Sequence, residues 1–150
     1  YTITVSGMGL TLGAGTEEVE NNATAAGSSD LQRATGYALY TNGPMTIGYQ
    51  EYYVNSANAS ASGAQAPDNE GDGMGILFAQ DNYSISYAEV NEQVEAISAT
   101  TQEYETEMTA LQATYTMGAM TIGASLYETD NPEGTTGKYE ETELSVSFAF

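Results

Sequence analysis

The residues of this chain that could carry out chemistry are almost all carboxylic acids. Its 150 residues include 21 Asp and Glu, two bases (Arg33 and Lys138), and no His or Cys. Ser-His-Asp, Cys-His and zinc arrangements are therefore impossible or strongly strained. Adjacent acids such as Glu140 and Glu141 could in principle support acid–base catalysis, but neighbours on a strand face opposite sides. We expect a solvated acidic rim instead, with no enzymatic activity and no cofactor.

One acidic stretch resembles the front of a calcium-binding loop. Residues 68–73 read Asp-Asn-Glu-Gly-Asp-Gly, which places oxygen ligands at alternate positions. The closing bidentate Glu of an EF-hand is missing, because the twelfth position is Ala79. The sequence therefore predicts only weak divalent binding, by Asp68, Glu70 and Asp72.

Composition and charge exclude several classes of protein. The net charge of -19 argues against binding to nucleic acid or anionic lipid. No segment approaches the roughly 18 consecutive apolar residues of a transmembrane helix. Disorder is disfavoured because the 12 Tyr recur inside alternating segments. The absence of Cys excludes disulfides and fits a cell-envelope protein.

The final stretch, Tyr139–Phe150, has a period of two. Its apolar side chains fall at Leu144, Val146, Phe148 and Phe150, and Ser or Ala lies between them. Because successive strand side chains point to opposite faces, this pattern predicts a strand with one apolar face and one small or polar face.

Tight-turn signals join pairs of such strands along the whole chain. A strand end, a Gly-containing turn and Leu/Met-Thr-Leu/Ile-Gly recur around residues 9, 43 and 118, and Asp81-Asn82 is a shorter turn. Long polar connections alternate with these turns, at about 17–33, 55–72, 92–104 and 130–138. We therefore predict a partial strand at 1–5 and eight full strands at about 9–16, 34–41, 45–54, 73–80, 83–91, 104–116, 120–129 and 139–150.

The alternation also assigns side chains to faces. The outward face is predicted to hold the apolar residues, including Tyr37 and Leu39, with Tyr53, Tyr83, Tyr87, Tyr115 and Phe150 near its borders. Tyr52, Tyr127 and Tyr139 would join this aromatic border only if a bulge shifts the phase. The polar inward candidates are Thr46, Gln50, Ser84, Ser86, Gln112, Thr114, Thr121, Ser125, Ser145 and Ser147.

Residues 93–108 allow two interpretations. Val94, Ile97, Thr101, Tyr104 and Met108 recur at helical spacing. The segment is also rich in Thr and Ser, which are weak helix formers, and no Gly ends it. We favour a loop followed by a strand, with room for a short surface helix.

The Gly-x-Met-Thr-Ile-Gly hairpins at 43–48 and 118–123, together with the Tyr139–Phe150 ending, resemble general porins of the alphaproteobacterial type. The resemblance implies an all-β, antiparallel transmembrane barrel of 16 strands that assembles as a homotrimer. A partial strand before eight full ones suggests that residues 1–150 are the C-terminal half of such a barrel, truncated at the N-terminus. The constriction loop of these porins would lie upstream.

The resemblance implies an outer-membrane location in a Gram-negative bacterium and passive diffusion of small hydrophilic solutes, including ions. The inward candidates would line the pore, and Leu144, Val146, Phe148 and Phe150 would be the signal read by the barrel-assembly machinery. Lipopolysaccharide would contact the outer wall and share divalent ions with the acidic loops. The acid excess predicts a weak cation preference.

The roles of the two bases, and two other classes of protein, remain open. Arg33 and Lys138 have the outward phase near the rim, where pairing with loop carboxylates or headgroups is expected; a place in a basic pore wall is the alternative. An eight-stranded barrel with a structural or adhesive role is the second interpretation of the whole chain. A soluble β-sandwich is the third, but it would need a second sheet to cover the apolar face.

Overall fold

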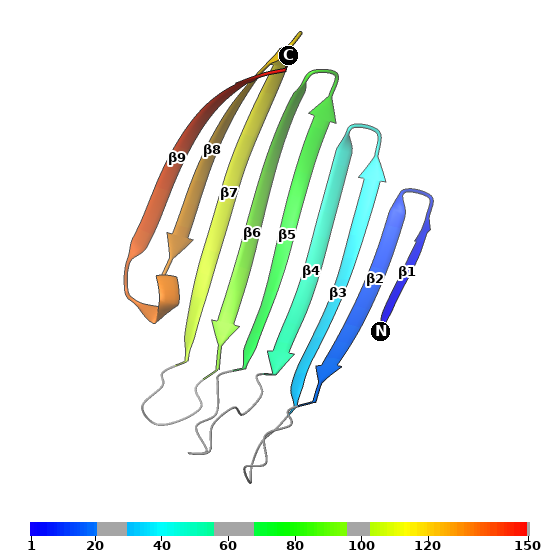
Figure 1. Cartoon of the computed structure of the whole chain (residues 1–150), viewed down its shortest axis with the longest axis vertical. Helices are drawn as coiled ribbons and strands as arrows, with labels where there is room; N and C mark the ends of the chain where they lie inside the picture. The colour runs from blue at the N-terminus through cyan, green and yellow to red at the C-terminus, as the bar shows by residue number, and fades with distance from the viewer. Residues whose placement is uncertain (21–29, 56–67, 96–102, 150) are drawn as a thin grey trace.

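The chain forms a single antiparallel sheet in which neighbours along the sequence are neighbours in space. The computed structural model describes residues 1–20, 30–55, 68–95 and 103–149. The sheet has nine strands in the order β1 to β9, and β1 and β9 form its two open edges (Figure 1). The strands are β1 (Thr2–Gly7), β2 (Leu10–Val19), β3 (Leu31–Asn42), β4 (Met45–Asn55), β5 (Asn69–Gln80), β6 (Tyr83–Val94), β7 (Tyr104–Met117), β8 (Met120–Asp130) and β9 (Lys138–Phe148). The predicted eight full strands with a partial strand before them are confirmed.

Four two-residue turns lie at one end of the strands, which we call the turn edge; the opposite end is the loop edge. Gly43 (φ 57°) and Gly118 (φ 62°) take the left-handed backbone at the first turn position, where glycine is favoured. Asp81 (φ 53°) takes it without being glycine. Met8 (φ 51°) and Gly9 (φ 81°) both have positive φ, as in a type I′ turn. These geometries suit the twist of a hairpin, so the turns set the register.

Several strands reach further toward the loop edge than the sequence suggested. Thus β5 starts at Asn69 rather than 73, and β3 starts at Leu31 rather than 34. Asn, Glu and Gly have low strand propensity, but here the ladder to the neighbouring strand continues through them, with Gly71 opposite Tyr52. The predicted long connection at 55–72 is therefore too long at its end, since residues 69–72 belong to an extended strand.

The structure decides between helix and strand for the described part of residues 93–108. Residues 104–108 belong to β7, as the loop-plus-strand interpretation predicted; residues 96–102 lie outside the described residues. No helix in the described ranges is long and apolar enough to cross a membrane.

The β8–β9 connection folds back onto β7. It contains a short 3-10 helix, η1 (Pro132–Gly134). Asn131 donates from Nδ2 to the carbonyl of Glu105 at 2.7 Å, and the hydroxyl of Thr106 donates to the carbonyl of Asn131 at 3.1 Å. Gly134 lies close to the ring of Tyr104, where a Cβ would be 2.8 Å from ring atoms. These contacts fix the connection beside the loop edge of β7.

The sheet has almost no core of its own. Among the described apolar residues only Val94 is buried, at 5% exposure, whereas Ile85 is 48% and Leu144 is 74% exposed. Because an extended sheet with two open faces leaves its apolar side chains uncovered, each face needs a surrounding medium or partner that suits it.

Candidate functional site: the two faces of the sheet

The register sorts the side chains onto two faces, because residues directly opposite each other on antiparallel strands point to the same side. One face, which we call the polar face, can be followed from strand to strand: Thr46 of β4 is opposite Leu77 of β5, and Leu77 is opposite Ser86 of β6. All ten inward candidates lie on this face, namely Thr46, Gln50, Ser84, Ser86, Gln112, Thr114, Thr121, Ser125, Ser145 and Ser147. The alternation in the sequence thus correctly predicted that these residues share one face. Their role in lining a pore stays a prediction.

Hydroxyl and amide groups on the polar face are bonded across strands. Ser84 and Thr114 hydroxyls are 2.7 Å apart, and those of Thr116 and Thr121 are 3.0 Å apart. Gln112 Nε2 donates to the hydroxyl of Tyr127 at 2.7 Å. Such lateral bonds hold polar side chains along the wall, where they can still exchange hydrogen bonds with water.

The predicted outward placement of Tyr37 and Leu39 is wrong. The register pairs Tyr37 with Gly13 and Leu39 with Thr11, which puts both on the polar face, and Tyr40 takes the apolar side opposite Leu10. Alternation alone could not assign the faces of residues 37–40, because this Tyr-Ala-Leu-Tyr segment has bulky side chains at both odd and even positions. Tyr52, Tyr127 and Tyr139 also lie on the polar face, since no bulge interrupts the register of the described strands.

Bulky side chains on the polar face lie across glycines of the next strand. The ring of Tyr37 occupies the space where Gly13 would carry a Cβ, and the ring of Tyr52 comes within 2.6 Å of such a position at Gly71. Glycine opposite a large residue is the signal that could have identified these wall residues, but reading it requires the register.

The two bases lie on opposite faces, which corrects the outward phase predicted for Arg33. Arg33 is on the polar face opposite Glu17, and its Nη1 is 3.0 Å from Glu17 Oε2. Lys138 is on the other face, with Nζ 2.8 Å from Glu128 and 3.1 Å from Glu140. The hydrogen bonds that Nζ donates to Glu128 and then to Glu140 raise the pKa of Lys138, which lies at the loop edge. Both bases pair with carboxylates of strand residues.

The opposite face is apolar over its middle. We call this region the apolar belt; it consists of Met45, Ile47, Ile76, Phe78, Ile85, Tyr87, Leu111, Ala113, Ile122, Ala124, Leu126, Leu144 and Val146. Phe148 continues it at the turn edge, opposite Met120. Leu144, Val146 and Phe148 thus share one face as predicted, and Phe150 lies outside the described residues.

Tyrosines mark the loop-side border of the apolar belt. The hydroxyl of Tyr49 donates to Glu51 at 2.6 Å, and that of Tyr87 donates to Glu89 at 3.0 Å. Each ring lies at the level of apolar residues while its hydroxyl points to a carboxylate two residues nearer the loop edge. This amphipathic placement is typical of an aromatic girdle at a membrane interface.

The carboxylates beyond this border lie mainly on the same side as the belt. That side holds Glu18, Glu51, Glu70, Asp72, Glu89, Glu105, Glu107, Glu128, Asp130 and Glu140, whereas the polar face holds Glu17, Glu92, Glu141 and Glu143. Within the described ranges no three acids are grouped closely enough to hold a metal ion. Weak divalent binding by Asp68, Glu70 and Asp72 therefore has no structural support here.

The chain was compared with protein-family models, curated proteins and solved structures. No protein-family model and no curated protein matches the chain. A solved structure does match: a porin refined at 1.8 Å resolution superposes with a TM-score of 0.73 at 14% sequence identity. The sheet has a porin-like fold. The match covers 98% of this chain and 50% of the porin, so the chain spans half the length of that porin.

The porin-like fold agrees with the sorting of the two faces. In transmembrane β-barrels an apolar band faces lipid, aromatic girdles border it, and the interior is polar. The porin-like sheet described here is open, since β1 and β9 are not paired with each other.

Proposed function

We propose that this chain forms part of the wall of an outer-membrane β-barrel whose water-filled channel passes small hydrophilic solutes by passive diffusion. The observation that carries the proposal is the division of one porin-like sheet into an apolar belt and a face rich in Ser, Thr, Gln, Gly and Tyr. A channel wall needs lipid-compatible side chains outside and hydrogen-bonding side chains inside. Diffusion through such a wall requires no catalytic group, so the proposal is a channel rather than an enzyme.

The direction of the strands favours a barrel larger than this sheet. Both β1 and β9 run from the loop edge to the turn edge, so joining them directly would create a parallel pair in an otherwise antiparallel wall. The alternative eight-stranded anchor would close β9 onto β2, but that edge of β2 is hydrogen-bonded to β1. A sandwich lacks support because all nine described strands lie in one sheet.

The remaining parts of the proposal concern partners and location. The apolar belt suits lipid, including lipopolysaccharide of a Gram-negative outer membrane. The alternation that ends in Leu144, Val146 and Phe148 suits recognition by the barrel-assembly machinery. Homotrimer formation and membership of the C-terminal half of a 16-stranded barrel rest on the resemblance of the sequence motifs to general porins.

The proposed channel prefers cations weakly. On the polar face four described acids (Glu17, Glu92, Glu141, Glu143) accompany one described base, Arg33, and Glu17 pairs with that base. The acids on the other side of the wall act on the lumen only at a distance. Because the Debye length is about 8 Å at physiological salt, screening reduces their effect.

Ion selectivity in planar bilayers tests this proposal. The native protein that carries this chain is reconstituted, and its reversal potential is measured across a potassium chloride gradient. We expect cation preference, which Glu141→Gln with Glu143→Gln reduces. The matched control is Glu105→Gln with Glu107→Gln, two acids with the same spacing on the other face of β7.

Each result has a distinct meaning. Absence of conductance would overturn the channel itself. Anion selectivity, or an equal effect of the two double variants, would overturn the assignment of cation preference to the polar face while leaving the channel intact.

A further inference from the structure

A hollow of about 340 Å³ lies on the polar face over β1, β2, β3 and β4. Functional ligand pockets start at about 300 Å³, so this hollow is large enough for one small solute. Gly15 lies at its floor, where a side chain would approach Thr2 at 3.1 Å and Thr35 at 3.7 Å. Polar-face residues around it include Glu17, Arg33, Thr35, Gln50, Tyr52 and Val54.

The hollow presents paired charges at its loop side. Arg33 Nη1 contacts Glu17 Oε2 at 3.0 Å, and their side chains are 53% and 58% exposed. A guanidinium has five N–H donors and a carboxylate about four acceptor positions, so this single contact uses a small part of their capacity. Since the two charges offset each other, the pair offers strong donors and acceptors without attracting an ion of either sign.

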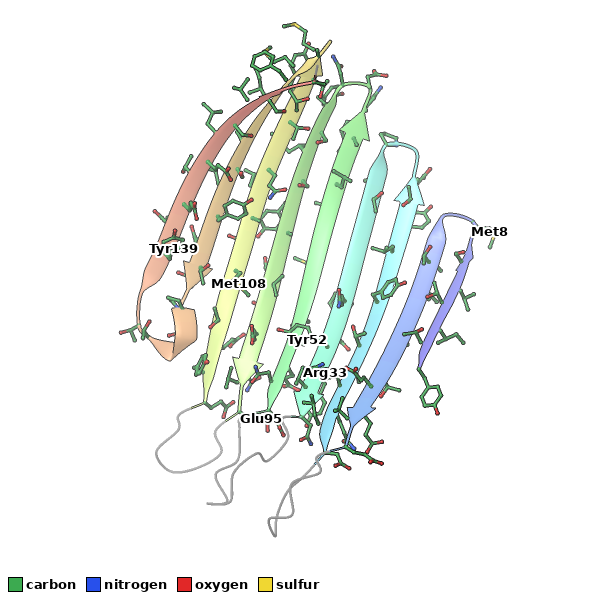
Figure 2. All side chains as sticks on the ribbon, in the orientation of Figure 1. Met8, Arg33, Tyr52, Glu95, Met108 and Tyr139 are labelled. Carbon is green, nitrogen blue, oxygen red and sulfur yellow. The ribbon has the colours of Figure 1, made fainter. Side chains whose placement is uncertain are left out.

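The rest of the hollow combines apolar surface with neutral polar groups. Tyr52 and Val54 contribute apolar surface, and Figure 2 shows Tyr52 and Arg33 on adjacent strands near the loop edge. Gln50 Nε2 donates to Thr35 Oγ1 at 3.1 Å, which holds a neutral amide and hydroxyl beside the floor. A ligand for this surface needs C–H groups on one side and several hydroxyls that both donate and accept.

We propose that this hollow is a weak binding subsite for neutral polyhydroxy solutes of the size of a monosaccharide. Hydroxyl groups bridge Arg33 and Glu17, and the C–H face of the sugar packs on Tyr52 and Val54. The inference deepens the proposed channel function and rests on it. It assigns Arg33 to solute contact rather than to the membrane-facing rim.

Glucose titration of the ion current tests the subsite. In the reconstituted native protein we expect the current to fall and saturate with glucose, each variant being normalised to its own sugar-free conductance. Gly15→Val fills the floor; the matched control, Gly75→Val, adds the same side chain to the same face of β5, outside the hollow. We expect Gly15→Val to raise the half-saturating glucose concentration about tenfold, the equivalent of about 1.4 kcal/mol.

A second variant removes the hydrogen-bonding charges without filling the hollow. Glu17→Gln with Arg33→Met leaves the net charge unchanged, and it should also abolish saturation by glucose. A purely linear fall of current with glucose in the unaltered protein would overturn the subsite, as would equal behaviour of the two valine variants. Saturation by zwitterionic glycine but not by glucose would overturn the ligand class. Absence of conductance would instead overturn the channel.

Discussion

Glycines opposite bulky residues shape the polar face at the level of single side chains. Tyr37 covers Gly13, and Tyr52 covers Gly71. The large side chain lies flat over the neighbouring strand, which protects backbone that glycine would otherwise expose. Because these rings lie along the sheet rather than projecting from it, the polar face can contain several tyrosines and still leave space for water.

Substituting Gly13 tests this packing. Gly13→Ala places a methyl group where the Tyr37 ring lies, so the ring has to swing away from β2. We expect a loss of about 1–2 kcal/mol, in the range of overpacking substitutions. Heat denaturation of the native protein in detergent, followed by circular dichroism, measures it.

Two comparisons isolate the contact between ring and glycine. Gly75→Ala adds a methyl on the same face at ordinary distances, 3.5 Å from the Tyr87 carbonyl, and should change stability little. In a Tyr37→Ser background the cost of Gly13→Ala should disappear. If the cost persisted there, contact with the Tyr37 ring would not be its cause.

Among structural elements, the turns are where backbone conformation matters most. Gly118 (φ 62°) has no atom within 4 Å of the position that a Cβ would take, and neither has Gly7, whose φ is not positive. Gly118→Ala should therefore cost about 1–2 kcal/mol through backbone strain alone. Gly7→Ala should be neutral or slightly stabilising, because it reduces the freedom of the unfolded chain.

Unfolding midpoints of these two variants in guanidinium chloride provide the measurement. Equal midpoints would show that the β7–β8 turn relaxes to another geometry, and the proposed role of Gly118 in setting the register would be lost.

The elements themselves were largely predictable, for reasons visible in particular residues. Alternation in Leu144 to Phe148 and glycine at positions 43 and 118 identified strands and turns, because both signals are local. The first residues of β5 were missed, since Asn69 to Gly73 have loop-like composition and are held extended by pairing with β4. The face of Tyr37 was missed for the same reason: register is a property of two strands.

At the scale of the whole molecule, the two faces should respond oppositely to charge. Ile85 lies within the apolar belt, and its neighbour Ser86 lies on the polar face opposite Gln112. Ile85→Lys should cost about 2–4 kcal/mol in a bilayer, the value for a lysine at the lipid-facing midplane. Ser86→Lys should leave insertion intact because its side chain meets water.

Insertion into lipid vesicles, measured as protease-resistant folded protein, separates the two variants. Equal tolerance of both lysines would mean that the apolar belt does not face lipid, and the assignment of inside and outside would fail.

The candidate site was predictable only in part at this scale. Ser and Thr at alternate positions identified the polar wall, whereas the hollow beside Arg33 depends on the register that brings residues of neighbouring strands together. The distribution of acids also required the register, because Glu141 and Glu140 are adjacent in sequence yet face opposite sides.

If the sheet becomes part of the barrel proposed above, its open edges matter during the stage before that barrel is complete. Outer strands such as β1 and β9 present unpaired backbone donors and acceptors, and such edges are templates for strand addition. Between these edges lies the apolar belt, whose exposure to water is unfavourable. Any stage of biogenesis that leaves these edges uncovered is thus a stage at which copies can add to one another as aggregates. Assembly of the barrel proposed above therefore depends on keeping the strands apart until their final neighbours are in place.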